Sequence, residues 1–401
     1  MHGVWANGIP LRESEVTLPQ VLGEAGYATA ACGKVHFEPQ QPYGGVAPRI
    51  EGSYYGFDEV HLTENTLGRE YLDWIDEQYP ELAETVQGRE GVPEEAHELQ
   101  WIADQAIGFM SEQVQAGRPF FCQCSFHELS PPCTPPPTFE GHFRPQDMPV
   151  PELREEDLAG KPAFYRECYE GYVRNGRQPD EATLRRYIAS YYDQQRFLDH
   201  QFGRVVEALK AAGAWDNTIV VFTADHGLAL NEHWQWRHGP FLFDEVVHIP
   251  LIWRVPGMAD GGEVREQFAE QVDLMPTLLE LCGAHAPSGV QGQSLVPVLR
   301  GEGAGGKDCV LLQERHAPDL LARGLEPESV WQVAVRTKEW KLIHYVGAPY
   351  GELYDLRNDP GEFVNLWDEA AYLGRRRELQ ALLAERLAAT QDPLPERAWE
   401  W

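Results

Sequence analysis

Five residues with chemically useful side chains follow three apolar stretches that read as strands, in each case at or just past the strand's end. These residues are Lys34 and His36 after Tyr27–Cys32, His127 after Phe120–Phe126, and Asp225 and His226 after Asn217–Thr223. In open α/β sheets, ligands bind at the carboxyl ends of the strands. We therefore expect these side chains to converge in one pocket over the edge of a sheet.

The residue types suggest a site for an oxyanion ester. Asp225 and His226 together offer a carboxylate and an imidazole, which is half of a plausible divalent-metal site. Lys34 and His36 can each donate to sulfuryl or phosphoryl oxygens if their loop bends. His127 can donate a proton to the leaving-group oxygen as a general acid.

Plainer interpretations compete with this one. His36 and His127 could be half-buried histidines that bond to backbone carbonyls. The segment from Glu232 to His238 (EHWQWRH) could be a surface loop with aromatic contacts. Its cations, Arg237 and His238, could equally complete an anion pocket, and the residues alone leave both possibilities open.

The elements around these residues alternate between helices and strands. Helices are predicted over Thr17–Ala25, Gln100–Gln115 and Glu181–Ala212, and a further strand over Ile249–Val255. Such alternation favours a mostly parallel sheet that helices cover on both faces. The acidic, turn-rich stretches Gln40–Glu98 and Pro145–Asp180 are expected to be surface insertions, and Pro131–Pro137 a rigid connector.

A change of pattern follows the glycine-rich stretch Gly301–Gly306, which we interpret as a linker between a domain over residues 1–300 and a subdomain over 307–401. Strands are predicted over Val330–Thr337 and Trp340–Tyr345, after which Glu352–Asp355 leads to a turn at Asn358–Gly361, and a last helix is predicted over Glu369–Thr390. The subdomain is thus expected to be a small antiparallel sheet with one helix.

Composition excludes several classes of partner. The 401 residues carry a formal net charge of −30, which argues against binding to nucleic acid or to an anionic membrane surface. No apolar run is long enough to cross a bilayer. The seven cysteines form no CxxC pair, and the first residues do not resemble a signal peptide. These features favour reduced thiols and a cytoplasmic location.

The chain resembles the sulfatase family of the alkaline-phosphatase-like superfamily over nearly its whole length. The similar segments, in the family's order, are Thr17–Phe37 with its Gly-Lys-x-His ending, Tyr55–Asp58, Ser125–His127, Thr223–Gly227 (TADHG), Val272–Leu279, Gly292–Gly301 and Gly351–Asn365. The resemblance implies an alkaline-phosphatase-like α/β fold and hydrolysis of small-molecule sulfate esters, as in an arylsulfatase. It also implies a divalent metal, Ca²⁺ or alternatively Mn²⁺ or Mg²⁺, bound by Asp225 and His226. Lys34 and His36 would bind and orient the sulfate, His127 would contact the ester near its leaving oxygen, and Arg237 and His238 would bind substrate.

The sequence departs from the family in two respects. No Cys or Ser is followed by x-Pro-x-Arg, the motif whose first residue the family oxidises to its formylglycine nucleophile. Met1 is therefore expected to be an internal start, with the nucleophile and further metal ligands encoded upstream and the chain inactive as given. His238 also stands where the family usually has Lys. The alternatives are a phosphodiesterase or phosphonate monoester hydrolase of the same superfamily, and a non-catalytic protein that keeps the fold as a binding module.

Overall fold

The computed structural model describes residues 4, 9–39, 53–63, 67–127, 129, 133–258, 261–302, 306–315 and 331–391. The chain forms two compact units, each made of separate stretches of sequence. We call Asn7–Pro151 with Gln178–Val220 the N-terminal unit, and Glu152–Arg177 with Val221–Trp401, together with the first six residues, the C-terminal unit. Among the described residues, no helix is long and apolar enough to cross a membrane.

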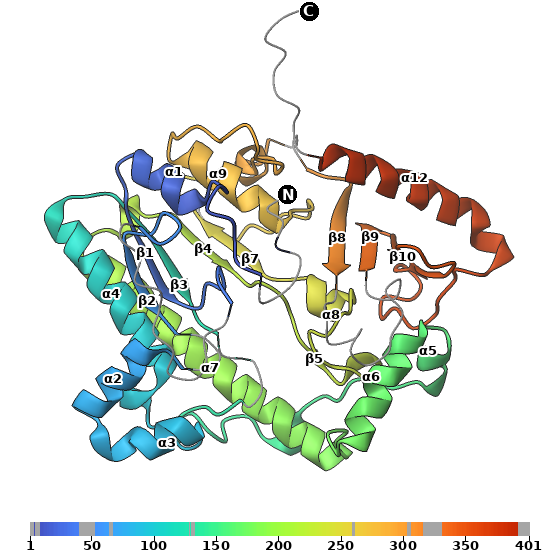
Figure 1. Cartoon of the computed structure of the whole chain (residues 1–401), viewed down its shortest axis with the longest axis horizontal. Coiled ribbons are helices and arrows are strands. Elements are labelled where there is room, and N and C mark those ends of the chain that lie inside the picture. Colours follow the sequence, from blue (N-terminus) through green and yellow to red (C-terminus); the bar gives the residue numbers. More distant parts are fainter. Residues whose placement is uncertain are drawn as a thin grey trace, which may run out of the picture. The chain divides into compact units, whose positions relative to one another are not determined.

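The N-terminal unit contains a parallel three-stranded sheet in the order β2-β1-β3 (Figure 1). Its strands are β1 (Ala28–Gly33), β2 (Glu59–Leu62) and β3 (Phe120–Ser125), and its helices are α1 (Leu18–Glu24), α2 (Arg69–Gln78), α3 (Ala83–Gly88), α4 (Glu98–Ala116) and α7 (Glu181–Ala211).

The central strand β1 is buried at all six positions because both faces of the sheet are covered. On one face Ala28, Ala30 and Cys32 join a core with residues of α4. On the other face Ala31 packs with Tyr54 and Phe57. This double burial explains why β1 reads as an uninterrupted run of small, mostly apolar residues rather than an alternating pattern.

The C-terminal unit contains an antiparallel four-stranded sheet in the order β11-β10-β9-β8. The strands of this sheet are β8 (Cys309–Arg315), β9 (Trp331–Thr337), β10 (Trp340–Tyr345) and β11 (Gly351–Asp355). Two separate strand pairs are formed by β4 (Val220–Thr223, at the border of the two units) with β7 (Leu251–Arg254), and by β5 (Ala229–Leu230) with β6 (Trp236–Arg237). The helices of the C-terminal unit are α5 (Glu155–Ala159), α6 (Ala163–Arg174), α8 (Asp244–Val247), α9 (Leu274–Leu281), α10 (Val296–Leu299) and α12 (Leu373–Ala389).

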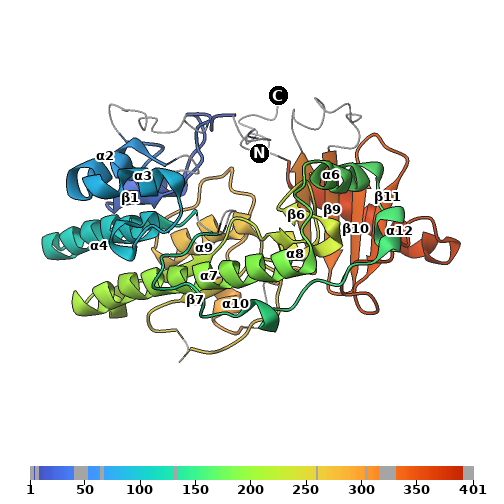
Figure 2. The ribbon, with the colours of Figure 1, turned by 90° about the horizontal axis from the view of Figure 1, so that it is seen from below.

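Two helices from distant parts of the sequence sandwich this antiparallel sheet, as Figure 2 shows for α6 and α12. Val333 and Val335 of β9 face Leu379 and Leu383 of α12. Ala334, between them, faces the opposite side with Phe164 and Tyr165 of α6. The prediction of a sheet with one helix was therefore incomplete, since α6 supplies the second cover.

Most predicted elements are confirmed, and with them the α/β fold class. The predicted helices over Thr17–Ala25, Gln100–Gln115 and Glu181–Ala212 correspond to α1, α4 and α7. The predicted strand over Asn217–Thr223 begins only at Val220, because Trp215–Asn217 forms a 3-10 turn. β3 was expected to be buried but is only half-buried, since it lies at an edge of the described sheet.

The prediction of two surface insertions was wrong for their described parts. In Gln40–Glu98, Tyr71 and Ile75 of α2 are each 1% exposed and belong to the main core. In Pro145–Asp180, Phe164 and Tyr165 of α6 pack on the antiparallel sheet. The acidic residues lie on the outer faces of these helices, so average composition hid their apolar stripes. The boundary near Gly301–Gly306 stays a prediction, because residues 303–305 lie outside the described residues.

Candidate active site

The carboxyl edge of the N-terminal sheet brings Lys34 and His127 to neighbouring strand ends. Gly33 and Ser125 are partners in the register of β1 and β3, and the backbone N–H of Lys34 donates to the Ser125 carbonyl at 3.1 Å. Gly33 is required at this close approach, since a Cβ there would lie 1.9 Å from the Ser125 oxygen and its φ is +97°. His36 follows on the same loop, half-buried and with a left-handed φ of 53°.

His127 has a buried carboxylate partner. Its Nε2 lies 3.1 Å from Oε2 of Glu98, with the two side chains 2% and 4% exposed. The Thr63 hydroxyl donates to the other carboxylate oxygen, Oε1, of Glu98. Burial alone would raise the pKa of Glu98, but the His127 charge and the bonds from His127 and Thr63 lower it overall.

This arrangement keeps Glu98 ionised beside the His127 ring. Because the His127 side chain is only 2% exposed, any group that contacts it must lie against the strand end rather than in bulk solvent. Glu98 was missed by sequence reasoning. It opens a helix instead of ending a strand, so the strand-end rule could not find it.

In the C-terminal unit, Asp225 and His226 present their side chains on a tight turn after β4. Their side chains are 71% and 35% exposed, and His226 Nε2 lies 3.6 Å from Asp225 Oδ2. Gln271 donates from its side chain to the Asp225 carbonyl at 2.8 Å, and the Gly227 N–H donates to the Val246 carbonyl at 2.7 Å. A Cβ at Gly227 would lie 2.1 Å from the Glu245 carbonyl oxygen, so only glycine fits there.

The fit of these two residues to a divalent metal is partial. Carboxylate and imidazole are both ordinary ligands, and both side chains are accessible. Within the described ranges, however, no third His, Cys, Asp or Glu joins them to form a group that could hold a metal. Ca²⁺ takes six to eight oxygen ligands, so this pair supplies only a minority of a calcium site.

Arg237 and His238 lie at the end of a short hairpin formed by β5 and β6. Ala229 pairs with Arg237 and Leu230 with Trp236. Both Arg237 and His238 are exposed, and the His238 ring lies 4.5 Å from the His226 ring, centroid to centroid. The structure thus brings His238 beside the predicted metal-ligand turn.

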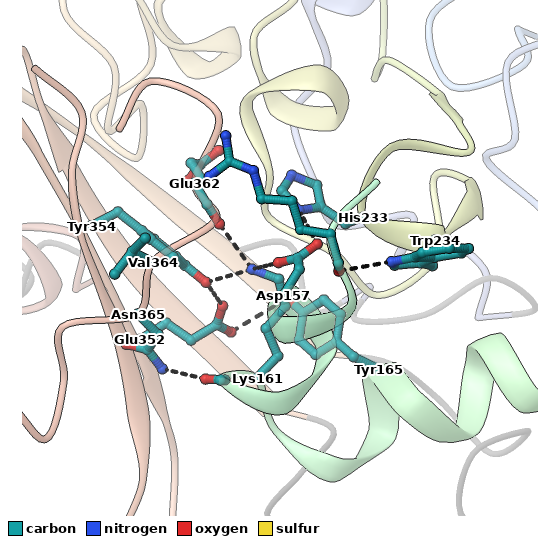
Figure 3. Close-up of polar contacts among 12 residues, drawn as sticks. Asp157, Lys161, Tyr165, His233, Trp234, Glu352, Tyr354, Glu362, Val364 and Asn365 are labelled. Atoms are coloured by element: carbon teal, nitrogen blue, oxygen red, sulfur yellow. Dashed lines mark hydrogen bonds and ion pairs between the residues drawn. The ribbon is translucent and has the colours of Figure 1, made fainter. Parts of the chain in front are cut away.

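The hairpin is fastened on its inner side by buried polar contacts (Figure 3). His233 Nδ1 lies 3.0 Å from Oδ2 of Asp157, whose Oδ1 lies 3.0 Å from the Lys161 ammonium. All three side chains are at most 1% exposed. The surface-loop interpretation of Glu232–His238 is therefore wrong for His233, which is part of the core.

Comparison with known proteins identifies the family. The Sulfatase family profile matches residues 1–284, and the profile of the N-sulphoglucosamine sulphohydrolase C-terminal region matches residues 232–392. The chain belongs to the sulfatase family. The resemblance in its sequence motifs is confirmed, and with it the class of sulfuric ester hydrolases.

Individual sulfatase relatives match most of the chain. It is 27% identical to the N-acetylglucosamine-6-O-sulfatase of Bacteroides thetaiotaomicron, over 98% of this chain and 76% of that protein. It is 24% identical to an arylsulfatase of Clostridium perfringens, over 94% of this chain and 79% of the relative. Among solved structures, the phosphonate monoester hydrolase of Agrobacterium radiobacter superposes with a TM-score of 0.84 at 26% identity, covering 98% of this chain and 84% of that one.

Proposed function

We propose that this sulfatase hydrolyses small-molecule sulfuric esters with the seven predicted residues in distinct roles. In the N-terminal unit, Lys34 and His36 bind and orient the sulfuryl oxygens, and His127 protonates the leaving-group oxygen. In the C-terminal unit, Asp225 and His226 are metal ligands, while Arg237 and His238 bind substrate. The observation that carries the proposal is the position of Lys34 and His127 at partnered strand ends, with a Glu98 carboxylate oxygen 3.1 Å from His127 Nε2.

The roles follow from simple chemistry. When the S–O bond of the ester breaks, its electron pair passes to the leaving oxygen, which needs a proton unless the leaving group is very acidic. An imidazolium beside a buried carboxylate can supply that proton and end the step neutral. Lys34 offers up to three N–H donors to the sulfuryl oxygens, whose negative charge persists throughout the reaction.

The metal and the nucleophile are both expected from the family. Asp225 and His226 would supply part of the metal site, but the 401 residues do not contain the nucleophile motif. The sulfatase family implies a divalent metal, and Ca²⁺ is the ion that we propose, with Mn²⁺ and Mg²⁺ as alternatives. The family's nucleophile is formylglycine, but no Cys or Ser in the 401 residues is followed by x-Pro-x-Arg. We therefore predict that the 401-residue polypeptide by itself does not turn over sulfate esters.

That prediction is tested with the purified 401-residue polypeptide and 4-nitrophenyl sulfate in the presence of Ca²⁺. We expect no release of 4-nitrophenol above the buffer rate. Turnover that is lost in a Lys34→Ala variant would contradict the prediction, because it would show that a nucleophile exists within these residues.

The substrate class is tested with the protein expressed with any in-frame codons that its gene carries before Met1, together with a formylglycine-generating enzyme. We call this the gene-length protein. A panel of 4-nitrophenyl sulfate, bis(4-nitrophenyl) phosphate and 4-nitrophenyl phenylphosphonate is compared by kcat/KM. We expect the sulfate to be the best substrate.

A phosphonate monoester hydrolase is the second candidate, and its support is the close superposition on the Agrobacterium radiobacter enzyme. Higher kcat/KM for the phosphonate than for the sulfate would favour it. A stop codon directly upstream of Met1, with no turnover of any panel member, would favour a non-catalytic binding module.

A further inference from the structure

The segment from Asn231 to Arg237, which comprises the β5–β6 turn and β6, has an unusual backbone. Four non-glycine residues in seven adopt left-handed φ angles: Asn231 (84°), His233 (52°), Trp234 (63°) and Arg237 (63°). This region is disfavoured for residues with a side chain, and such conformations persist only where surrounding contacts enforce them. The turn therefore needs an external clamp.

The clamp comes from the segment that contains α5 and the start of α6, which holds three consecutive residues of the turn. His233 contacts the Asp157 carboxylate at 3.0 Å and also stacks on Phe243, with ring centroids 3.7 Å apart. The Trp234 indole N–H donates to the Arg154 carbonyl at 3.0 Å, and the Gln235 amide donates to the Tyr165 carbonyl at 3.0 Å.

The clamp is itself anchored in the C-terminal sheet through Lys161. Its ammonium pairs with Asp157 at 3.0 Å and donates to the Tyr354 hydroxyl and the Glu362 carbonyl, each at 2.9 Å (Figure 3). Asn365 adds a bond from its side-chain amide to the Gly160 carbonyl at 2.8 Å. The hairpin, α5 and the strand β11 are thus joined by one buried network.

A fully buried ion pair contributes little net stability, because the cost of removing both charges from water offsets their attraction. A network of this kind can instead select one arrangement of the chain over others. Here the arrangement selected is that of a hairpin whose outer end carries Arg237 and His238. A guanidinium binds a sulfuryl group well only when its planar N–H groups are aimed correctly, so a fixed hairpin improves binding.

We propose that Asp157 and Lys161 are positioning residues that hold the β5–β6 hairpin so that Arg237 and His238 can bind the sulfuryl group of the substrate. This inference rests on the proposed function for the identity of the ligand. The existence of the clamp does not depend on the proposed function.

The test replaces the ion pair with apolar residues of similar volume in the double variant Asp157→Leu/Lys161→Met. Because neither charge is left buried alone, the unit should still fold. The matched control is Glu170→Gln/Arg174→Met, which removes an exposed ion pair of the same spacing from α6. Hydrogen exchange of the 401-residue polypeptide measures how firmly the hairpin is held. Calorimetric binding of 4-nitrophenyl sulfate to the gene-length protein, expressed without the formylglycine-generating enzyme so that the ester is not turned over, measures the effect on the ligand.

We expect amides of residues 231–237 to exchange at least tenfold faster in the double variant, with β9 and β10 unchanged, and the affinity for the sulfate ester to fall about tenfold. The control variant should match wild type in both its amide exchange rates and its affinity for the sulfate ester. Unchanged exchange in the hairpin would overturn the proposal. Faster exchange with unchanged affinity would also overturn it, since the hairpin would then be clamped without serving the ligand. A wild-type protein that binds no sulfate ester would instead refute the proposed function, while the exchange result would still decide whether the clamp exists.

Discussion

His97 shows how the position of a single residue sets its charge. It caps the start of α4, where its Nδ1 accepts from the Leu99 N–H at 3.2 Å, and it lies against the Phe197 ring. Burial lowers the pKa of His97 to about 4. A proton on Nδ1 would break the cap, so the neutral ring and the start of the helix depend on each other.

This neutral histidine should make stability depend on pH. Between pH 6.5 and 4 the unfolded chain binds a proton at His97 and the folded chain does not. The stabilising contribution of neutral His97 to the unfolding free energy is therefore fully present above this pH range and is lost as the pH falls through it. From pH 7 to pH 5 we expect the His97 contribution to cost about 2 kcal/mol of unfolding free energy. Urea unfolding at both pH values measures this loss.

The matched variant is His97→Asn, which keeps a capping oxygen but does not titrate. Its loss between pH 7 and 5 should be smaller than that of wild type by about this amount. His142→Asn, at an exposed histidine, should behave as wild type. If all three proteins lost the same unfolding free energy between pH 7 and pH 5, the pH dependence could not be assigned to His97.

At the residue scale, sequence reasoning found the side chains that face outward and missed those that hold them. Lys34, Asp225 and His226 were found because each follows a strand. Glu98 and Asp157 were missed because each acts on a histidine distant in sequence, His127 and His233 respectively. No local pattern records such a pairing, which only the tertiary fold creates.

At the scale of elements, β10 carries a lysine into the core of the C-terminal unit. The Lys341 side chain is 0% exposed, and its ammonium lies 2.6 Å from both an Asp244 and a Glu362 carboxylate oxygen. It also donates to the Leu242 carbonyl at 2.9 Å. These contacts fasten α8 and the loop after β11 to the sheet.

Removing this charge should therefore be costly. Lys341→Met leaves the buried Glu362 carboxylate without its cation, whereas Asp244 keeps its ion pair with Arg336. We expect a loss of about 3–5 kcal/mol in unfolding free energy. Lys338→Met, on the exposed turn before β10, should change stability by less than about 0.5 kcal/mol. Urea unfolding of both variants checks this, and a loss below about 1 kcal/mol for Lys341→Met would show that the Glu362 carboxylate is neutralised in another way.

At the scale of the whole molecule, the alternation of helices and strands was enough to predict the α/β class and most element positions. The packing of α6 on the antiparallel sheet could not be predicted in the same way. Tyr165 of α6 and Glu352 of β11 are separated by 187 residues, yet the Tyr165 hydroxyl donates to the Glu352 carboxylate at 3.3 Å. A sequence pattern reports that a helix has an apolar face, but not which sheet that face meets.

The same limit applies to the site. Strand-end positions predict that Lys34 and His127 share a sheet edge, because parallel strands in one sheet end on the same side. The register that makes Gly33 and Ser125 direct partners depends on the whole sheet and became visible only in the structure.

The most direct test of the central claim, that strand-end Lys34 and His127 act on a sulfate ester, is the kcat/KM of the gene-length protein for phenyl sulfate, whose weakly acidic phenol leaving group needs a proton. Removing one donor to a developing or bound anion typically costs about 10²–10³-fold, so Lys34→Ala and His127→Ala should each fall by at least about 10²-fold. Lys210→Ala, at an exposed lysine of α7, should stay within about twofold of wild type. Wild-type kcat/KM in correctly folded Lys34→Ala and His127→Ala proteins would contradict the account.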